Sequence, residues 1–416
     1  MVSRGTSQQS SAPFNRRIVL DVIRRAGSVS RKEIVDAVSL SPQTVANITH
    51  DLESIGLVVS RRLKEKVRGQ PPIAFELNPH GGSSIGISLE PGGLSAALVN
   101  PVGDVIKKRE VDLDTRNPRK VLANMVSIVK DLGSRRVAGE RLWGVGVALP
   151  GPLVLTDISF VGPTALEGWT DLSILDELRG VTGLHVVYSV DSVAGALGES
   201  LFGVAKGLDT FFYIHFGVGL GGTLVVNRSA YKGASGNATE IGHMPVVANG
   251  KACYCGNRGC LERYLSLHSL AEDLGIPEVH DRGKEVLARM LAEDDKRLLA
   301  WCKQAAVHLR SAVCTVENIL DPETIVIGGS APKRLVEHVV RMAQPLDRSV
   351  RGGLVHPTER IVLSERQEDS SILGAAVLPI HEMLSPRVEV LMKDRRDSPK
   401  VEGLLGQRVT SGAGRV

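Results

Sequence analysis

The stretch that decides the fold begins with Gly242-His243 and continues, after nine intervening residues, as Cys253-Tyr254-Cys255-Gly256-Asn257-Arg258-Gly259-Cys260-Leu261-Glu262. Three of the five cysteines of the chain lie within these eight positions, 253–260. Three thiolates and one imidazole are the ligand set of a closed, tetrahedral structural zinc site. Gly256 and Gly259 allow the backbone to turn tightly between the sulfurs. We therefore expect zinc bound by His243, Cys253, Cys255 and Cys260.

The alternative is that the three cysteines cluster by chance, or that one of them forms a disulfide. The first fifteen residues are polar and lack the apolar segment of a signal peptide. We therefore expect a cytoplasmic protein, in which thiols stay reduced and dense cysteines usually bind metal. The other two cysteines, Cys302 and Cys314, lie in apolar helical sequence and are expected in the core.

The length and the charge of the chain limit its organisation. A chain of 416 residues is too long for one ordinary core and predicts two or three domains. No apolar run is long enough to span a membrane. Residues 1–79 carry twelve Lys and Arg against seven Asp and Glu, whereas the net charge of the whole chain is only +4. The basic N-terminal part indicates a polyanionic partner.

The N-terminal part has the pattern of a small domain of its own. Residues 1–13 are rich in Ser and Gln and are predicted to be a disordered tail. Within residues 14–77, three short helical patterns precede two strands with basic residues between them, which predicts a winged helix-turn-helix. Ser30 and Glu33 have the spacing of a capping box at the start of the second helix, and Pro42 suits the first position of the third helix.

The third helix, residues 42–55, is expected to contact the bases of DNA. Its buried face is predicted to contain Val45, Ile48, Leu52 and Ile55. Its expected DNA contacts are Gln43, Thr44, Asn47 and His50, because amide side chains pair well with adenine in the major groove. Arg31 and Lys32 of the preceding helix and Arg68 of the hairpin are expected near phosphates or a minor groove. The alternative is a small protein-binding domain with a solvated basic hairpin.

The rest of the chain is a long α/β region between two flexible segments. Residues 78–84 are predicted to be a linker, 85–386 an effector body, and 387–416 a disordered tail. Strands are expected at 85–89, 95–99, 144–148, 185–190, 211–216, 222–227 and 324–328. Helices are expected at 118–133, 192–201, 261–273, 283–318, 333–344 and 371–384.

The cysteine stretch resembles the zinc signature of the ROK family, which reads G-H, a short spacer, then C-x-C-G-x-x-G-C-x-E. Every fixed position is matched between Gly242 and Glu262. This family comprises bacterial sugar kinases and sugar-responsive transcriptional repressors, and the N-terminal domain makes the chain similar to repressors of the N-acetylglucosamine and xylose type. The resemblance implies an α/β fold with an actin-like (ribonuclease H-like), two-lobed body and a zinc-binding loop at 240–262.

The phosphate-binding motif of the family, D-x-G-G-T, is not kept. Ser88 stands at the position of the aspartate, and Glu90 and Pro91 replace the glycines. These changes add a negative charge and remove a backbone N–H donor, and both oppose phosphate binding. We therefore expect no catalytic residue and no enzyme activity. The glycine-rich loop 217–222 is kept, although close strand packing explains such a loop equally well.

The sugar-binding side of the family site is better kept. Asp191 stands at the position of the family's catalytic base, and Glu240 and Glu262 stand at those of carboxylates that bind sugar hydroxyls. The resemblance also implies that His243 binds zinc through one nitrogen and offers the other to the sugar. The implied sugar-binding set is Asp191, Glu240, His243 and Glu262. The alternatives are helix capping for Asp191 and support of the metal loop for the two glutamates.

The resemblance implies a DNA-binding regulator, a repressor that leaves its operator when a sugar or sugar derivative binds without being phosphorylated. The implied partners are double-stranded operator DNA, the sugar effector and further copies of the chain in a dimer or tetramer. Two alternatives stay open. Asp191 favours an active ATP-dependent sugar kinase, whereas Val190, which replaces a family asparagine, favours a body that senses a protein.

Overall fold

The described part of the chain divides into two units: the first holds residues 8–53, 60–62, 73–76 and 383–384, and the second holds the described residues of 54–59 and 77–382. The computed structural model describes residues 8–62, 73–136, 140–151, 173–279, 283–352 and 358–384, and the single positions 162, 164 and 169. The predicted tail at 387–416 and the hairpin turn with Arg68 lie outside the described residues.

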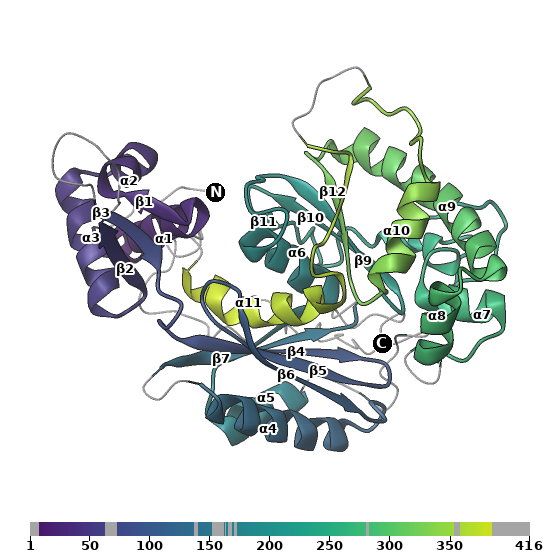
Figure 1. Cartoon of the computed structure of the whole chain (residues 1–416), viewed down its shortest axis with the longest axis horizontal. Coiled ribbons are helices and arrows are strands. Elements are labelled where there is room, and N and C mark those ends of the chain that lie inside the picture. The colour runs from purple at the N-terminus through teal and green to yellow at the C-terminus, as the bar shows by residue number, and fades with distance from the viewer. Residues whose placement is uncertain are drawn as a thin grey trace, which may run out of the picture. The chain divides into compact units, whose positions relative to one another are not determined.

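The first unit contains the predicted helices and hairpin (Figure 1). Its elements are α1 (Gln8–Ala26), β1 (Ser28–Ser30), α2 (Arg31–Val38), α3 (Pro42–Ser54), β2 (Val58–Arg62) and β3 (Ile73–Leu77). The three strands form one sheet in the order β1-β3-β2. Three helices and a strand pair in this order are the plan of a winged helix-turn-helix.

Local sequence explains how these helices begin and end. The predicted capping box is present: the Glu33 backbone N–H donates to Ser30 Oγ at 3.3 Å, and the Ser30 N–H donates to Glu33 Oε2 at 2.8 Å. Helix α2 ends where Ser39 adopts a left-handed conformation with φ of 52°. Pro42 is the first residue of α3. The small core contains Ile23, Ile34, Val45, Leu52 and Phe75, all buried.

Three details of this unit differ from the prediction. Helix α1 begins at Gln8, within the segment predicted to be a tail. The prediction missed this first part of the helix because a Ser- and Gln-rich stretch has no apolar periodicity. The short strand β1 pairs with β3 and was not predicted. Ile55, predicted to be buried, is 52% exposed, because α3 ends at Ser54 and Gly56 turns the chain with φ of 76°.

The second unit contains two five-stranded sheets of the same topology. The first has the order β6-β5-β4-β7-β8 and the second β11-β10-β9-β12-β13. In each sheet three strands pair antiparallel and two more continue in parallel. The strands are β4 (Ser83–Glu90), β5 (Gly93–Val99), β6 (Val105–Asp112), β7 (Leu142–Leu149), β8 (Val186–Val190), β9 (Phe211–Phe216), β10 (Leu220–Val226), β11 (Ser229–Ala230), β12 (Ile325–Gly328) and β13 (Ile361–Leu363). This repeat confirms the expected two-lobed, ribonuclease H-like α/β body.

Helices cover the outer faces of both sheets and fill the space between them (Figure 1). The first sheet packs against α4 (Pro118–Ser134) and α5 (Ser173–Thr182), and the second against α7 (Leu267–Leu274), α8 (Gly283–Ala292), α9 (Lys296–Leu320) and α10 (Lys333–Met342). Helices α6 (Asp191–Phe202) and α11 (Ser370–Leu384) lie between the sheets. Three short 3₁₀ segments are η1 (Ile241–His243), η2 (Leu261–Arg263) and η3 (Gln367–Asp369).

Small residues allow the two central helices to approach the sheet and each other closely. A Cβ atom placed on Gly146 of β7 would lie 1.8 Å from the carbonyl oxygen of Ala375. A Cβ on Gly374 of α11 would lie 2.1 Å from the carbonyl oxygen of Ala194 in α6. Glycine is therefore required where α11 crosses β7 and where it meets α6.

Several boundaries in the second unit differ from the prediction. The predicted helix 283–318 is two helices, because Asp295 caps α9 by accepting the N–H of Arg297 at 2.8 Å. The predicted helix 261–273 consists of η2 and α7, separated by the cap residue Ser266. The predicted linker 78–84 is shorter, since β4 begins at Ser83. The elements β6, β11, β13 and α5 were not predicted. No helix in the described part of the chain is both long and apolar enough to cross a membrane.

We expect Gly146→Ala to destabilise the second unit by about 3 kcal/mol, because the added methyl group would overlap a backbone oxygen that cannot move alone. Gly180 is the matched control: it lies exposed in α5, and a Cβ there would meet nothing within 4 Å. Gly180→Ala should leave stability unchanged or raise it by up to about 1 kcal/mol. Thermal unfolding followed by circular dichroism measures both. Equal melting temperatures for the two variants would contradict the packing argument.

Candidate functional site

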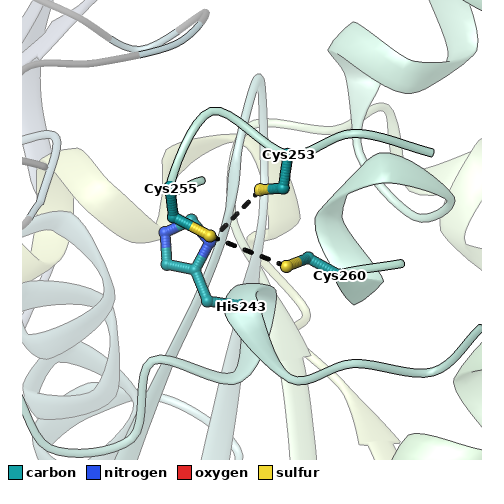
Figure 2. Close-up of side chains that lie close together, drawn as sticks. All are labelled: His243, Cys253, Cys255 and Cys260. Atoms are coloured by element: carbon teal, nitrogen blue, oxygen red, sulfur yellow. Dashed lines mark hydrogen bonds between the residues drawn. The ribbon is translucent and has the colours of Figure 1, made fainter. Parts of the chain in front are cut away.

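The four predicted metal ligands converge in the second unit (Figure 2). The ligand atoms of His243, Cys253, Cys255 and Cys260 all lie within 4.8 Å of one another. His243 Nδ1 lies 3.6 Å from Cys253 Sγ, and the sulfurs of Cys255 and Cys260 are 3.7 Å apart. None of the five cysteines forms a disulfide. Three sulfurs and one imidazole nitrogen at this separation fit a tetrahedral metal ion.

The backbone between the ligands is shaped for this convergence. The Gly256 N–H donates to the Cys253 carbonyl at 3.0 Å, which closes a tight turn between the first two sulfurs. Gly256 and Gly259 have φ of 89° and 80°, which favour glycine. At Gly259 a Cβ would also lie 1.8 Å from the Val247 carbonyl oxygen. The two glycines singled out in the sequence are therefore required by geometry.

Burial opposes the ionisation of all three thiols. Burial, together with hydrogen bonds to Cys253 and Cys255, raises the pKa of Cys260 to about 12. Burial also raises the pKa of Cys253. At Cys255 hydrogen bonds from Asn257 and the other two thiols outweigh burial, and its pKa is lowered. A thiol must lose its proton to bind metal, so a bound cation would lower the raised pKa values and release protons. The donor set and its burial are those of a metal site.

A polar network fixes the metal loop to the helix that follows it. The Arg263 guanidinium donates two hydrogen bonds to Glu272, at 2.9 and 2.7 Å. Its carbon lies 4.9 Å from the centre of the Tyr254 ring, whose hydroxyl is 2.7 Å from His268 Nε2. This network was not predicted, because its members are spread over three segments. Two further cysteines were predicted in the core. Cys302 is fully buried, whereas Cys314 is only half-buried.

Three predicted carboxylates lie near the metal loop. Asp191 is the first residue of α6, Glu240 immediately precedes η1, and Glu262 lies within η2. Burial, together with the negative charges of Asp191 and Glu262, raises the pKa of Glu240 to about 7. The three acids are therefore close enough to influence one another. Carboxylates grouped in this way can accept hydrogen bonds from several hydroxyls of one ligand.

The backbone holds two of these carboxylates in place. The N–H of Leu220 donates to Glu262 Oε2 at 2.9 Å. Glu240 follows Thr239, which has φ of 69°, an unfavourable conformation for a β-branched residue. The Thr239 hydroxyl donates to the Gly222 carbonyl at 3.0 Å, which anchors this conformation. A strained residue next to a buried acid is typical of a functional site.

The predicted alternative of helix capping does not hold for Asp191, because Val190 is the N-cap of α6 and no side-chain cap hydrogen bond is present within the described structure. The Oδ1 atom of Asp191 accepts the N–H of Ser192 at 2.6 Å, which is a contact of a helix N-terminus. Its Oδ2 instead lies 3.6 Å from His215 Nε2. His215 was not among the predicted site residues, although a histidine in the otherwise apolar strand Phe211–Phe216 was the available signal.

Of the residues that replace the phosphate motif, Glu90 lies close enough to Asp191 for their charges to interact. Ser88 and Glu90 are the sixth and the last residue of β4 and share one face of the strand. Burial raises the pKa of Glu90, His215 opposes that shift, and the charge of Asp191 adds to it. The glycines of loop 217–222 have packing reasons of their own, since a Cβ on Gly222 would lie 2.7 Å from the Thr239 carbonyl oxygen.

The predicted DNA-contacting residues of α3 lie on one surface of the first unit. Gln43, Asn47 and His50 are exposed, and Thr44 is half-buried. The Gln43 amide donates to Asn47 Oδ1 at 2.9 Å, so the two amides form one polar surface. Arg31 and Lys32 are exposed on α2, and the Arg31 guanidinium lies 5.2 Å from the centre of the Phe75 ring. Arg68 lies outside the described residues.

Comparison with known proteins gives consistent matches. The sequence model of the ROK family matches residues 85–382. A xylose repressor of Caldicellulosiruptor bescii is 27% identical over 333 residues, which cover 76% of this chain and 83% of that protein. A glucokinase of Thermotoga maritima is 28% identical over 316 residues, which cover 70% and 95%. A solved ROK family transcriptional regulator, described as a homologue of the E. coli MLC protein, superposes with a TM-score of 0.68 at 24% identity and covers 92% of this chain and 100% of that one.

We expect the contribution of Glu240 to the stability of the protein to fall as pH rises from about 4.5 to about 7, because the folded state holds the Glu240 proton over this range and the unfolded state does not. Glu240→Gln should remove this loss and raise stability at pH 8 by at most about 3 kcal/mol, with little effect at pH 4.5. Melting temperatures of both proteins at the two pH values measure this. Glu337→Gln, an exposed change on α10, is the control. A constant difference between wild type and Glu240→Gln at both pH values would contradict the pKa.

Proposed function

The chain belongs to the ROK family, and on this premise we propose that it is a transcriptional repressor whose body binds a sugar or sugar derivative. The observation that carries the proposal is the combination of two sites in one chain. An N-terminal unit exposes Gln43, Asn47 and His50 on one helix, and the body groups three carboxylates beside a metal site.

The proposed DNA site is on α3. Glutamine and asparagine can each form two hydrogen bonds with adenine, and His50 extends the same exposed face. Arg31 and Lys32 on α2 are suited to phosphate contacts, which fix orientation without selecting sequence. The proposed partner is a double-stranded operator, and a symmetric operator would need at least two copies of the chain. This partner and the reduced thiols favour the cytoplasm.

The proposed effector site is formed by Asp191, Glu240 and Glu262, with His243 next to them. The metal proposed for the four-ligand site is zinc, because three thiolates and one imidazole match its preferred donors. Four protein ligands leave no position for water or substrate, so the ion would be structural. It would hold Glu240, His243 and Glu262 in one arrangement.

We propose no phosphoryl transfer. Phosphoryl transfer needs groups that neutralise the charge of the phosphates. At the positions of the family's phosphate-binding motif, this sequence has Ser88 and Glu90 instead. Asp191 and the glucokinase relative favour the alternative of an active sugar kinase. A coupled ADP-release assay over a panel of sugars separates the two, and ATP-dependent turnover above about 1 s⁻¹ would favour the kinase. A body that senses a protein would bind no sugar in calorimetry.

We expect Asn47→Ala to weaken binding to a selected duplex by about 10- to 100-fold, because a bidentate base contact is lost. The duplex is first selected from a random library by the wild-type protein, and affinity is then measured by fluorescence anisotropy. Lys32→Ala should weaken binding to all sequences equally and lower the salt dependence by about one unit. Arg119→Ala on α4 is the control. Wild-type affinity of Asn47→Ala would exclude α3 as the helix that contacts bases.

We expect Cys255→Ala to lose the bound zinc and the response to sugar together, because the metal is proposed to hold the sugar-binding glutamates. Mass spectrometry of the metal gives its content, and release from the selected duplex gives the sugar response. Cys314→Ala, outside the cluster, should keep both. A metal-free Cys255→Ala protein with the wild-type sugar response would refute the coupling.

A further inference from the structure

One buried histidine adjoins the carboxylates but belongs to neither the metal site nor the apolar core. His215 lies on β9, is 5% exposed, and has Nε2 at 3.6 Å from Asp191 Oδ2. Its Nδ1 has no hydrogen-bond partner among the described residues. The hydroxyl of Ser88, which is 1% exposed, also lacks one within the same part of the chain. Buried polar atoms without partners are costly and call for an explanation.

The residues that flank His215 on the neighbouring strands are glycines, which have no side chains. His215 pairs in register with Gly221 on β10 and with Gly328 on β12. A Cβ at Gly217 would lie 2.8 Å from His215 Nε2, so a side chain at position 217 would displace the ring. Glycines on both flanking strands and in the following loop therefore leave room for the imidazole beside the N-terminus of α6.

The separation of the two side chains suits one bridging oxygen. At 3.6 Å, His215 Nε2 and Asp191 Oδ2 are too far apart for a good direct hydrogen bond. An oxygen placed about 2.8 Å from each atom would hydrogen-bond to both. A hydroxyl can fill this place because it donates to the carboxylate and accepts from the imidazole N–H.

We propose that His215 is a specificity-determining residue: together with Asp191 it recognises one free hydroxyl of the bound sugar and selects against the phosphate ester of that hydroxyl. This inference rests on the proposed sugar-binding function and specifies the chemical class of the effector as an unphosphorylated sugar.

Two features disfavour the ester. An ester oxygen has no hydrogen to donate, so it and Asp191 would face each other as two acceptors. The phosphate would also bring negative charge close to Asp191 and Glu90, whose charges already act on each other.

The experiment compares free sugars with their esters on the full-length protein. Calorimetric titrations use D-glucose, D-mannose, N-acetyl-D-glucosamine and D-ribose, each beside the ester that carries phosphate on its terminal carbon. At least one free sugar should bind, and its ester should bind at least about 30-fold more weakly. His215→Phe should weaken binding of the free sugar about 10-fold, because the imidazole N–H donor is lost. It should also lower the ratio of sugar affinity to ester affinity.

Two conservative variants separate recognition from a structural role. His215→Gln keeps an N–H donor and should retain most of the affinity that His215→Phe loses. Glu90→Gln removes a charge without changing shape and should raise the affinity for the ester several-fold. Melting temperature and metal content verify that each variant is folded, and a purely structural histidine would change these values without changing the ratio of ester to sugar affinity.

The outcomes distinguish this inference from the function on which it rests. If neither sugars nor esters bind, the proposed sugar sensing fails, and this inference fails with it. If free sugars bind but an ester binds as tightly as its parent, this inference alone is overturned. The same holds if His215→Phe is folded and leaves the ratio of affinities unchanged.

Discussion

The arrangement of the site depends on four ligand atoms drawn together from two separate turns. His243 ends one 3₁₀ segment, and the three sulfurs come from the loop that leads into the next. Backbone hydrogen bonds close each turn, such as that from the His243 N–H to the Glu240 carbonyl at 3.1 Å. Side chains from two separate turns need a further constraint to keep one arrangement. A metal ion bound by three thiolates and an imidazole would supply such a constraint. It would also help to fix Glu240 and Glu262, because each lies within three residues of a proposed ligand.

The metal cluster and the helices of the first unit were the most predictable parts. The spacing of cysteines, glycines and one histidine was sufficient, because each ligand type and each tight turn leaves a distinct residue in the sequence. The capping box at Ser30 and Glu33 was found for the same reason, since its two hydrogen bonds need fixed residue types at a fixed spacing. The family resemblance added the three carboxylates and the two-lobed body, which spacing alone does not show.

Other features could not be read from local patterns. The exposed edge strand β6 and the short strand β13 have weak alternation, so their pairing depends on neighbouring strands distant in sequence. The break between α8 and α9 was hidden because apolar residues continue on both sides of Asp295. The proximity of His215 to Asp191 arises only when a strand and a helix N-terminus meet. Such contacts between distant segments are set by the tertiary fold.

The contact between α6 and α11 has a mechanical consequence. At Ala194, Gly198 and Gly374 the two helices approach each other backbone to backbone. Beside this contact, the larger side chains of Leu197, Leu201, Val377 and Leu378 pack together. The two helices therefore fit closely and leave little room for one to shift without the other. Asp191 begins α6, and α11 rests on the first sheet at Gly86 and Gly146. A bound molecule that displaces Asp191 would therefore displace the start of α6. The close contact between the backbones of α6 and α11 would pass this displacement toward the first sheet.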